Sequence, residues 1–156
     1  ERHHRHVHAP PRAVFEAFCA LGGENGWPAG NWLWQVRGLL DRALGGVGMR
    51  RGRRHPTQLR VGEPVDFWRV EALEPDHLLR LRAEMRISGH AWLQFMVRPE
   101  GQGSRLEQTA FFEPHGLLGL AYWYASLPFH ILVFPAMIRA LKQRAEAAVG
   151  ESGSGR

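Results

Sequence analysis

The sequence predicts an α+β fold in which a curved antiparallel sheet grips a long C-terminal helix. Helical patterns and strand-like runs are segregated along the chain, an order that is typical of α+β proteins. The connections between the strand-like runs are only a few residues long, which indicates antiparallel neighbours rather than crossovers. The chain ends in a helical segment that is apolar on nearly every side, and such a helix has to be enclosed by other elements.

A short strand and a first helix are predicted at the N-terminal end. His4, His6 and His8 occupy every second position, a pattern that indicates one face of a strand. Residues 11–20 then carry apolar groups at helical spacing, with Pro11 in the first turn, where proline fits a helix.

A second helix is predicted from Trp32 to about Ala43, with Asn31 as its N-cap. Its apolar stripe, which we expect to face the core, consists of Leu33, Val36, Leu40 and Leu44. The glycine-rich segment Gly45–Gly48 ends the helix. It lacks the glycine spacing and the following Lys-Ser/Thr pair of a nucleotide-binding loop.

Four strand-like runs follow, separated by turn signals. They are Val65–Leu73, Leu78–Ile87, Ala91–Arg98 and Arg105–Glu113. Two shorter segments, Met49–Arg54 and Leu59–Val61, are candidates for one or two further strands.

The C-terminal segment predicts two helices, Gly116–Ala125 and Pro128–Ala148, with Pro128 in a first turn and Pro135 as a kink. Residues 116–138 carry no formal charge, a length that would cross a bilayer. The two prolines and the clustered central aromatics favour a buried helix pair instead, so we expect no membrane partner.

Composition excludes several classes of protein. Apolar residues make up 44% and charged residues 22% of the 156 residues, which excludes disorder and collagen-like repeats. The single cysteine, Cys19, excludes an intrachain disulfide and fits a reducing, cytoplasmic compartment. The net charge of +5 comes from nineteen arginines and one lysine, a bias that we attribute to codon composition. We expect residues 1–150 to form a single domain and residues 151–156 to form a flexible tail.

Four segments carry a resemblance to a known family. They are Trp34–Arg54 (WQVRGLLDRALGGVGMRRGRR), Val65–Glu71 (VDFWRVE), Leu81–Phe95 (LRAEMRISGHAWLQF) and Tyr122–Met137 (YWYASLPFHILVFPAM). Together they resemble an uncharacterised bacterial domain with the helix-grip fold of START-domain and birch-pollen-allergen-like proteins. That domain is often found behind an NAD(P)-binding short-chain-dehydrogenase-like domain. The resemblance implies a ligand cavity and a fused or partner oxidoreductase, and it brings no established reaction.

The densest charge lies at Arg50, Arg51, Arg53 and Arg54. On a strand, Arg51 and Arg53 would share one face and could form an anion-binding site for a phosphate group. A solvated or internally paired strand and a nucleic-acid surface are the alternatives. Because no aromatic residues are interleaved as in single-strand binders, we favour the solvated strand and expect no nucleic-acid partner.

Two further patterns have a structural and a chemical interpretation. His4, His6 and His8 could contribute two ligands to a metal ion, but the sequence identifies no third ligand, so we favour a hydrated terminal strand and expect no metal. Cys19 shares an apolar helix face with Phe18, and we expect it in the core rather than as a nucleophile. No cofactor is predicted.

Tryptophans with polar neighbours form the candidate ligand site. At least two of four tryptophans are expected to line one pocket of about 300 Å³ or more, the lower end for small-molecule sites, with Asp66 or His90 as a polar handle. His130, in the uncharged C-terminal run, is a further polar candidate. The candidate ligand-binding residues are Trp34, Asp66, Trp68, His90, Trp92 and Trp123.

The predicted function is binding of a small apolar or aromatic molecule between the sheet and the C-terminal helix, in the service of a fused or partner oxidoreductase. One alternative is a cavity enzyme of cyclase, aromatase or hydrolase type that uses Asp or His as acid or base. The other is an interaction module with a filled core. Convergence of Asp66, His90 and His130 in one pocket would favour the enzyme, and the cavity volume would separate binding from the interaction module.

Overall fold

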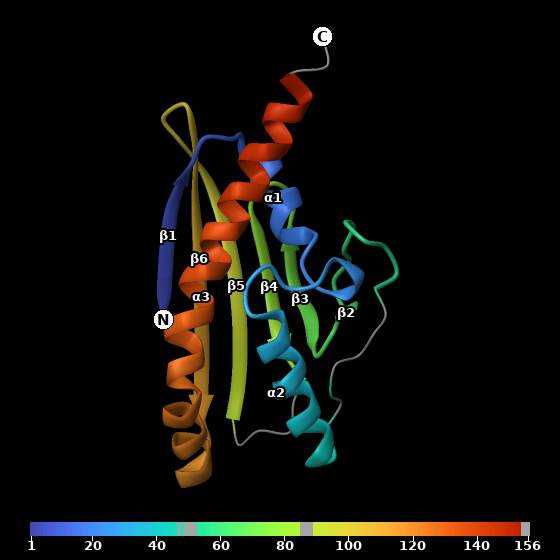
Figure 1. The fold of residues 1–156 in the computed structure, drawn as a ribbon, viewed down its shortest axis with the longest axis vertical. Coiled ribbons are helices and arrows are strands. Elements are labelled where there is room, and N and C mark those ends of the chain that lie inside the picture. The colour runs from blue at the N-terminus through green and yellow to red at the C-terminus, as the bar shows by residue number, and fades with distance from the viewer. Residues whose placement is uncertain (47, 49–52, 85–88, 154–156) are drawn as a thin grey trace.

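The computed structural model describes residues 1–46, 48, 53–84 and 89–153. It shows one six-stranded antiparallel sheet in the order β1-β6-β5-β4-β3-β2, with the helices on one of its faces (Figure 1). This arrangement confirms the predicted α+β class with a curved sheet and a long C-terminal helix. The strands are β1 Arg2–Val7, β2 Pro64–Val65, β3 Trp68–Glu74, β4 Leu78–Ala83, β5 Gly89–Glu100 and β6 Gly103–Pro114. The helices are α1 Pro11–Cys19, the short 3-10 helix η1 Gly23–Asn25, α2 Asn31–Ala43 and α3 Gly116–Gly153.

The predicted strand Val65–Leu73 is two strands, which corrects the prediction. Val65 of β2 pairs with Trp68 of β3, so Asp66 and Phe67 form a tight reversal. Asp66 has a φ of 56°, a left-handed conformation that aspartate tolerates better than most residues. As a result, Asp66 and Trp68 do not share a strand face.

The remaining strand predictions differ in detail. Leu59–Val61 forms no strand. Most of Met49–Arg54 lies outside the described residues, and Arg53 and Arg54 at its end are not in a strand. The predicted strand Leu78–Ile87 corresponds to β4, which ends at Ala83, and its last residues also lie outside the described part of the chain.

The predicted C-terminal helix pair is also wrong, because α3 is one continuous helix that contains Pro128 and Pro135. A proline removes the hydrogen bond to the carbonyl four residues earlier. Those carbonyls belong to Tyr124 and Ile131, whose side chains are exposed, so water can satisfy them. Helix α3 continues to Gly153, into the segment predicted as a tail.

The sheet does not enclose α3, contrary to the expectation for so apolar a helix. One stripe, including Val133, Met137 and Leu141, faces the sheet and α1, whereas Leu117 and Leu132 are 86% and 68% exposed. By length and composition α3 could cross a bilayer, and only 22% of its most apolar window is buried. The expectations of no membrane partner and a cytoplasmic location stay predictions.

The core lies between the concave face of the sheet, α1 and the C-terminal half of α3. Phe18 of α1 stacks on Phe95 of β5 with ring centroids 5.7 Å apart, and Leu81, Leu93 and Ile138 are almost fully buried around them. Cys19 is buried in this core, as predicted, and burial raises the pKa of its thiol to about 12.

Helix α2 has the opposite orientation from the predicted one. Its buried residues are Trp34, Gly38 and Asp41. Of the side chains predicted to face the core, Leu33 packs against it, whereas Val36, Leu40 and Leu44 are exposed, Leu40 at 61% and Leu44 at 70%. The inward face of α2 therefore carries one large aromatic ring and, three residues later, the charged Arg37.

Candidate functional site

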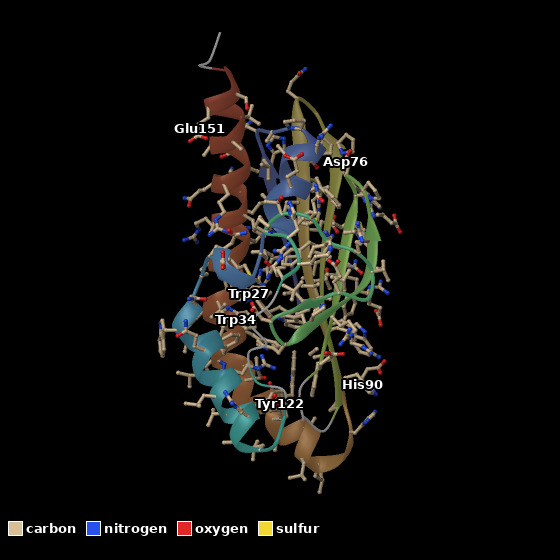
Figure 2. The ribbon with its side chains drawn as sticks, turned by 90° about the vertical axis from the view of Figure 1, so that its right-hand side faces the viewer. Trp27, Trp34, Asp76, His90, Tyr122 and Glu151 are labelled. Atoms are coloured by element: carbon tan, nitrogen blue, oxygen red, sulfur yellow. The ribbon has the colours of Figure 1, made fainter. Side chains whose placement is uncertain are left out.

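A layer of stacked aromatic rings separates the core from a hollow at the lower end of the molecule. Its centre is Trp34 of α2, which is fully buried. The Trp34 ring stacks on Trp27 at 4.9 Å and meets Phe129 of α3 edge-on at 4.9 Å. It also lies 6.4 Å from the Trp68 ring of β3. Figure 2 shows Trp27 and Trp34 between the helices and the sheet, with Tyr122 below them.

Below this layer, a hollow of about 20 Å³ lies between the sheet, α2 and α3. It is far smaller than the predicted pocket of about 300 Å³, although two of the four predicted tryptophans, Trp92 and Trp123, also line a larger groove of about 480 Å³. The hollow is small because its rings pack on one another: Phe112 of β6 stacks on Trp123 of α3 at 5.6 Å with an interplanar angle of 8°. The described residues that line it are Arg37, Trp68, Ala91, Trp92, Ala110, Phe111, Phe112, Tyr122, Trp123, Ser126, His130 and Phe134.

A larger, open groove of about 480 Å³ lies beside the hollow. The two share a wall that includes Trp92, Phe112 and Trp123. Charged residues of both signs, Glu1, Glu113 and Arg80, also line the groove. Its volume falls within the range of about 300–1,000 Å³ that small-molecule sites occupy.

The most unusual group in the hollow is the half-buried guanidinium of Arg37. It lies over the rings of Phe67, Tyr122 and Phe129, at 5.7, 5.5 and 5.9 Å from their centroids. Its Nη2 donates a hydrogen bond to the Tyr122 hydroxyl. Its Nε is buried and has no hydrogen-bond partner among the described residues. Burial lowers the pKa of Arg37 and outweighs the opposing effects of Tyr122 and Asp41.

His130 of α3 is the titratable imidazole of the hollow. Burial, followed by the charge of Arg37, lowers its pKa to about 4, so the ring is neutral at physiological pH. Its edge contacts Trp123 at 5.2 Å and Phe134 at 4.7 Å between ring centroids. Its Nδ1 lies 3.5 Å from a carboxylate oxygen of Glu1 without making a hydrogen bond within the described structure.

Two more buried polar atoms lie between the sheet and the helices: one on Trp68, which lines the hollow, and one on Gln108, whose amide nitrogen donates to the backbone oxygen of Phe134 on α3. Trp68 Nε1 is a donor and Gln108 Oε1 is an acceptor, and neither has a partner in the part of the chain that the structure describes. Because buried polar groups are normally hydrogen-bonded, a cluster of such atoms around one hollow indicates a place for a ligand or water.

The structure gathers some of the predicted site residues and separates others. Trp68, Trp92 and Trp123 line the hollow, and Trp34 contributes to the layer above it. His90 does not line it: its side chain is exposed on the opposite face of the sheet from the helices (Figure 2), next to Trp92 and His115. The strand alternation of β5 explains this placement, because Leu93, Phe95 and Val97 point into the core and His90 is in phase with the opposite face. Trp92 is also in that phase, and its Nε1 donates to Glu71, so it borders the hollow from the outer side.

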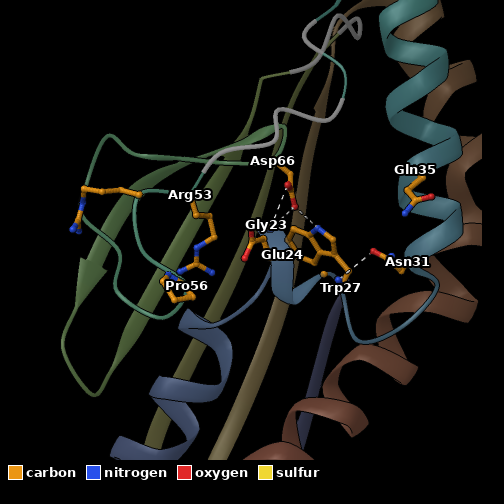
Figure 3. A pocket seen from close by; sticks show the side chains of 10 residues that line it. Gly23, Glu24, Trp27, Asn31, Gln35, Arg53, Pro56 and Asp66 are labelled. Carbon is orange, nitrogen blue, oxygen red and sulfur yellow. Dashed lines mark hydrogen bonds between the residues drawn. The ribbon is translucent and has the colours of Figure 1, made fainter.

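Asp66, the other predicted polar handle, lies at a different site. Figure 3 shows its carboxylate accepting hydrogen bonds from Trp27 Nε1 at 2.8 Å and from the backbone nitrogen of Gly23. This carboxylate joins the β2–β3 reversal to the loop around η1. It borders an open pocket of about 740 Å³ that Arg53 and Arg54 also line.

The predicted anion-binding pair is only partly described. Arg51 lies outside the described residues. Arg53 donates to the backbone oxygens of Leu21 and Cys19, so its terminal nitrogens hold the end of α1 to the following loop. Arg54 pairs with Glu63.

Arg37 and Tyr122 are the site residues that sequence reasoning missed. The available signal was an arginine three positions after Trp34, on the helix face that also carries Gly38. The sequence does not reveal its inward direction, because the aliphatic stripe of α2 predicts that the opposite side of the helix faces the core.

Comparison with known proteins supports this fold. The structure is similar to protein CV1439 from Chromobacterium violaceum, with a TM-score of 0.52, 17% identity and coverage of 94% of this chain and 96% of that one. It is also similar to truncated norcoclaurine synthase from Thalictrum flavum, with a TM-score of 0.52, 12% identity and coverage of 92% and 90%. XoxI from Bacillus cereus has a TM-score of 0.54, 12% identity and coverage of 92% of each chain. At these identities the likeness establishes the helix-grip fold alone.

Among curated proteins, no match to the chain is found. A family model described as "Protein of unknown function (DUF2867)" matches residues 2–137. Since this match spans most of the 156 residues, the chain belongs to the DUF2867 family of proteins of unknown function.

Proposed function

We propose that this protein binds a small molecule with an apolar or aromatic body, seated in the groove beside the hollow and reaching inward between the sheet, α2 and α3. The observation that carries the proposal is the cluster of unpartnered buried polar atoms, Arg37 Nε, Trp68 Nε1 and His130 Nδ1, around a space lined by aromatic rings. Ligand sites typically combine an apolar lining with a few polar groups that orient the ligand.

The groove and the hollow would bind different parts of the ligand. The groove of about 480 Å³ has room for a ring system, whereas the hollow of about 20 Å³ has room for about one water-sized group. Phe112 and Trp123 lie in the wall between them, so a turn of one ring would join the two spaces. In this proposal the ligand passes to or from a fused or partner NAD(P)-binding oxidoreductase, as the sequence resemblance implies.

The placement of the titratable groups favours binding over acid–base catalysis. A catalytic pair needs an acid and a base that reach the same substrate. Of the three candidates, only His130 lines the hollow, whereas Asp66 borders another pocket and His90 lies on the outer face of the sheet.

The small volume of the hollow supports a second candidate, an interaction module with a filled core. Large apolar side chains on α2, such as Leu39 at 68% and Leu44 at 70% exposure, would then contact a protein partner. The binding experiment below separates the two candidates, because a filled core would not admit a small aromatic molecule.

The proposal is tested by calorimetric titration with 2-naphthamide, a neutral two-ring probe. We expect saturable binding that weakens at least about fivefold in Trp123→Ala, a change of about 1 kcal/mol. The control Trp32→Ala, at an exposed position of α2, should leave binding unchanged. The absence of saturable binding, together with native mass spectrometry that finds no co-purified molecule, would overturn the proposal.

A further inference from the structure

The inward face of α2 places a positive charge in a largely apolar setting. The Arg37 guanidinium is surrounded by three aromatic rings, and arginine keeps its charge in proteins. Rings attract a cation through their electron-rich faces, but they accept few of the five N–H groups of a guanidinium. A half-buried charge of this kind is costly unless an anion and hydrogen-bond acceptors compensate it.

No such anion is provided by the described residues. None of their carboxylates forms an ion pair with Arg37, whose hydrogen-bond partner is the neutral Tyr122 hydroxyl. Asp41 stands four residues later on the same helix, but its carboxylate accepts a hydrogen bond from the backbone nitrogen of Gly48 at 3.0 Å. It therefore lies against the turn that follows α2, and its charge affects the pKa of Arg37 less than burial does.

The hollow holds unpartnered polar atoms of two kinds: His130 Nδ1, which can accept a hydrogen bond in one tautomer, and the donors of Arg37 and Trp68. Arg37 Nε and Trp68 Nε1 are buried donors without partners in the described structure. The Tyr122 hydroxyl accepts from Arg37, which leaves its own hydrogen available for donation. No aspartate or glutamate is among the described residues that line the hollow.

From the guanidinium without an ion pair and the two unpartnered donors beside it, we infer that the ligand carries a carboxylate, or an acidic oxygen of similar shape, which enters the hollow and is bound by Arg37, Tyr122 and Trp68. The inference rests on the proposed function and specifies the chemical class of the ligand. A charged oxygen accepts hydrogen bonds about twice as strong as those of a neutral one.

Volume and charge also orient the ligand. The hollow of about 20 Å³ fits one oxygen atom of a carboxylate, whereas the groove fits the apolar body. The groove is lined by charges of both signs, Glu1, Glu113 and Arg80, whereas the only charged side chain among the described residues that line the hollow is Arg37. The acidic end therefore points inward to Arg37, and the rings remain in the groove beside Phe112 and Trp123.

The inference is tested with two probes of the same body, 2-naphthoate and 2-naphthamide, by calorimetric titration of the full chain. We expect wild-type protein to bind the carboxylate at least about tenfold more tightly than the amide, a difference of about 1.4 kcal/mol. In Arg37→Met the affinity for naphthoate should fall at least about tenfold, while the affinity for naphthamide stays within about twofold. The matched control is Arg42→Met, on the exposed side of the same helix, which should change neither affinity.

The outcomes separate this inference from the proposed function. Equal binding of both probes by wild-type protein would overturn the inference, because the donors would then be satisfied by water, and would leave the proposed function standing. A naphthoate preference that survives in Arg37→Met and disappears in Arg42→Met would place the anion at the surface and would also overturn it. Failure of both probes to bind would count against the proposed function itself. The wild-type comparison requires no variant to fold.

Discussion

His130 should make the stability of the protein depend on pH in a defined window. The fold accommodates the neutral ring, since burial and the charge of Arg37 lower the pKa from 6.5 to about 4. The unfolded chain therefore binds a proton at this ring before the folded protein does as the pH falls. The stability from neutral His130 is complete above pH 6.5 and is lost as the pH falls towards 4.

The magnitude follows from the size of this change in pKa. One pKa unit corresponds to about 1.4 kcal/mol, so moving from about pH 7 to about pH 4.5 should lower the free energy of unfolding by about 2 kcal/mol. The assay is urea denaturation at both pH values, followed by tryptophan fluorescence and circular dichroism. A matched variant, His130→Gln, removes the titrating group and should reduce the loss to less than about 0.5 kcal/mol.

Two further variants locate the effect. His90→Gln changes an exposed ring and should retain the wild-type loss. Arg37→Met should reduce the loss without abolishing it, because burial contributes more to the lowered pKa of His130 than Arg37 does. A wild-type free energy of unfolding that is constant between the two pH values, or an equal loss in His130→Gln, would refute the reasoning.

Three other predictions concern packing and reactivity. Trp34→Ala should lower the free energy of unfolding by about 3–5 kcal/mol, because Trp34 is fully buried, whereas Trp32→Ala at 65% exposure should change it by less than about 0.5 kcal/mol; similar losses in urea denaturation would contradict this. Asp66→Ala should cost about 2 kcal/mol, because Trp27 Nε1 and Gly23 N lose their acceptor. Asp66→Asn should retain most of the stability, since asparagine keeps an acceptor and tolerates the left-handed backbone; equal losses would show that the carboxylate contacts are unimportant. The Cys19 thiol, with its pKa raised to about 12, should react with iodoacetamide far more slowly in native protein than in urea, and fast native labelling would contradict its burial.

Local patterns in the sequence predict much of the fold. Strands β5 and β6 follow from alternation over many residues, and a short Gly101–Gly103 turn fixes them as antiparallel neighbours. The existence of α1 and α2 follows from helical spacing and stop signals. These features depend on residues close together in the chain, so a single sequence is enough to predict them.

The errors arise where distant contacts decide the outcome. The reversal at Asp66 depends on its contact with Trp27, 39 residues away. Helix α3 can continue through Pro128 and Pro135 because the carbonyl groups that lose their hydrogen bonds lie on its water-exposed side. The sequence alone does not show which side of the helix is exposed. The rings of Phe112 and Trp123 come from different elements, and their stacking leaves only a small hollow next to the groove. The apolar periodicity of α2 was correct as a helix signal, but it did not determine the face turned to the core.

The orientation of α2 is the strongest argument that Arg37 serves binding rather than folding. Exposing Leu39, Leu40 and Leu44 forgoes burial that would contribute about 1.5–3 kcal/mol per side chain. Burial of Trp34 partly explains the orientation, and it brings the neighbouring position 37 inward. Folding alone would be served there by an uncharged side chain of similar length, because a charge without an anion opposes burial.

Arg37→Met should therefore retain wild-type stability while losing the preference for the carboxylate probe. Methionine fills a similar volume against Phe67 and Phe129 and needs no anion, whereas its cost is the lost hydrogen bond to Tyr122, about 1 kcal/mol. We expect urea denaturation to give a free energy of unfolding within about 1 kcal/mol of wild type. Removing the buried charge should offset part or all of the stability lost with the hydrogen bond to Tyr122. A substitution that weakens binding without lowering stability is typical of residues that serve function rather than folding. A loss well above that value in Arg37→Met, with unchanged probe preference, would instead make Arg37 a structural residue of the aromatic layer.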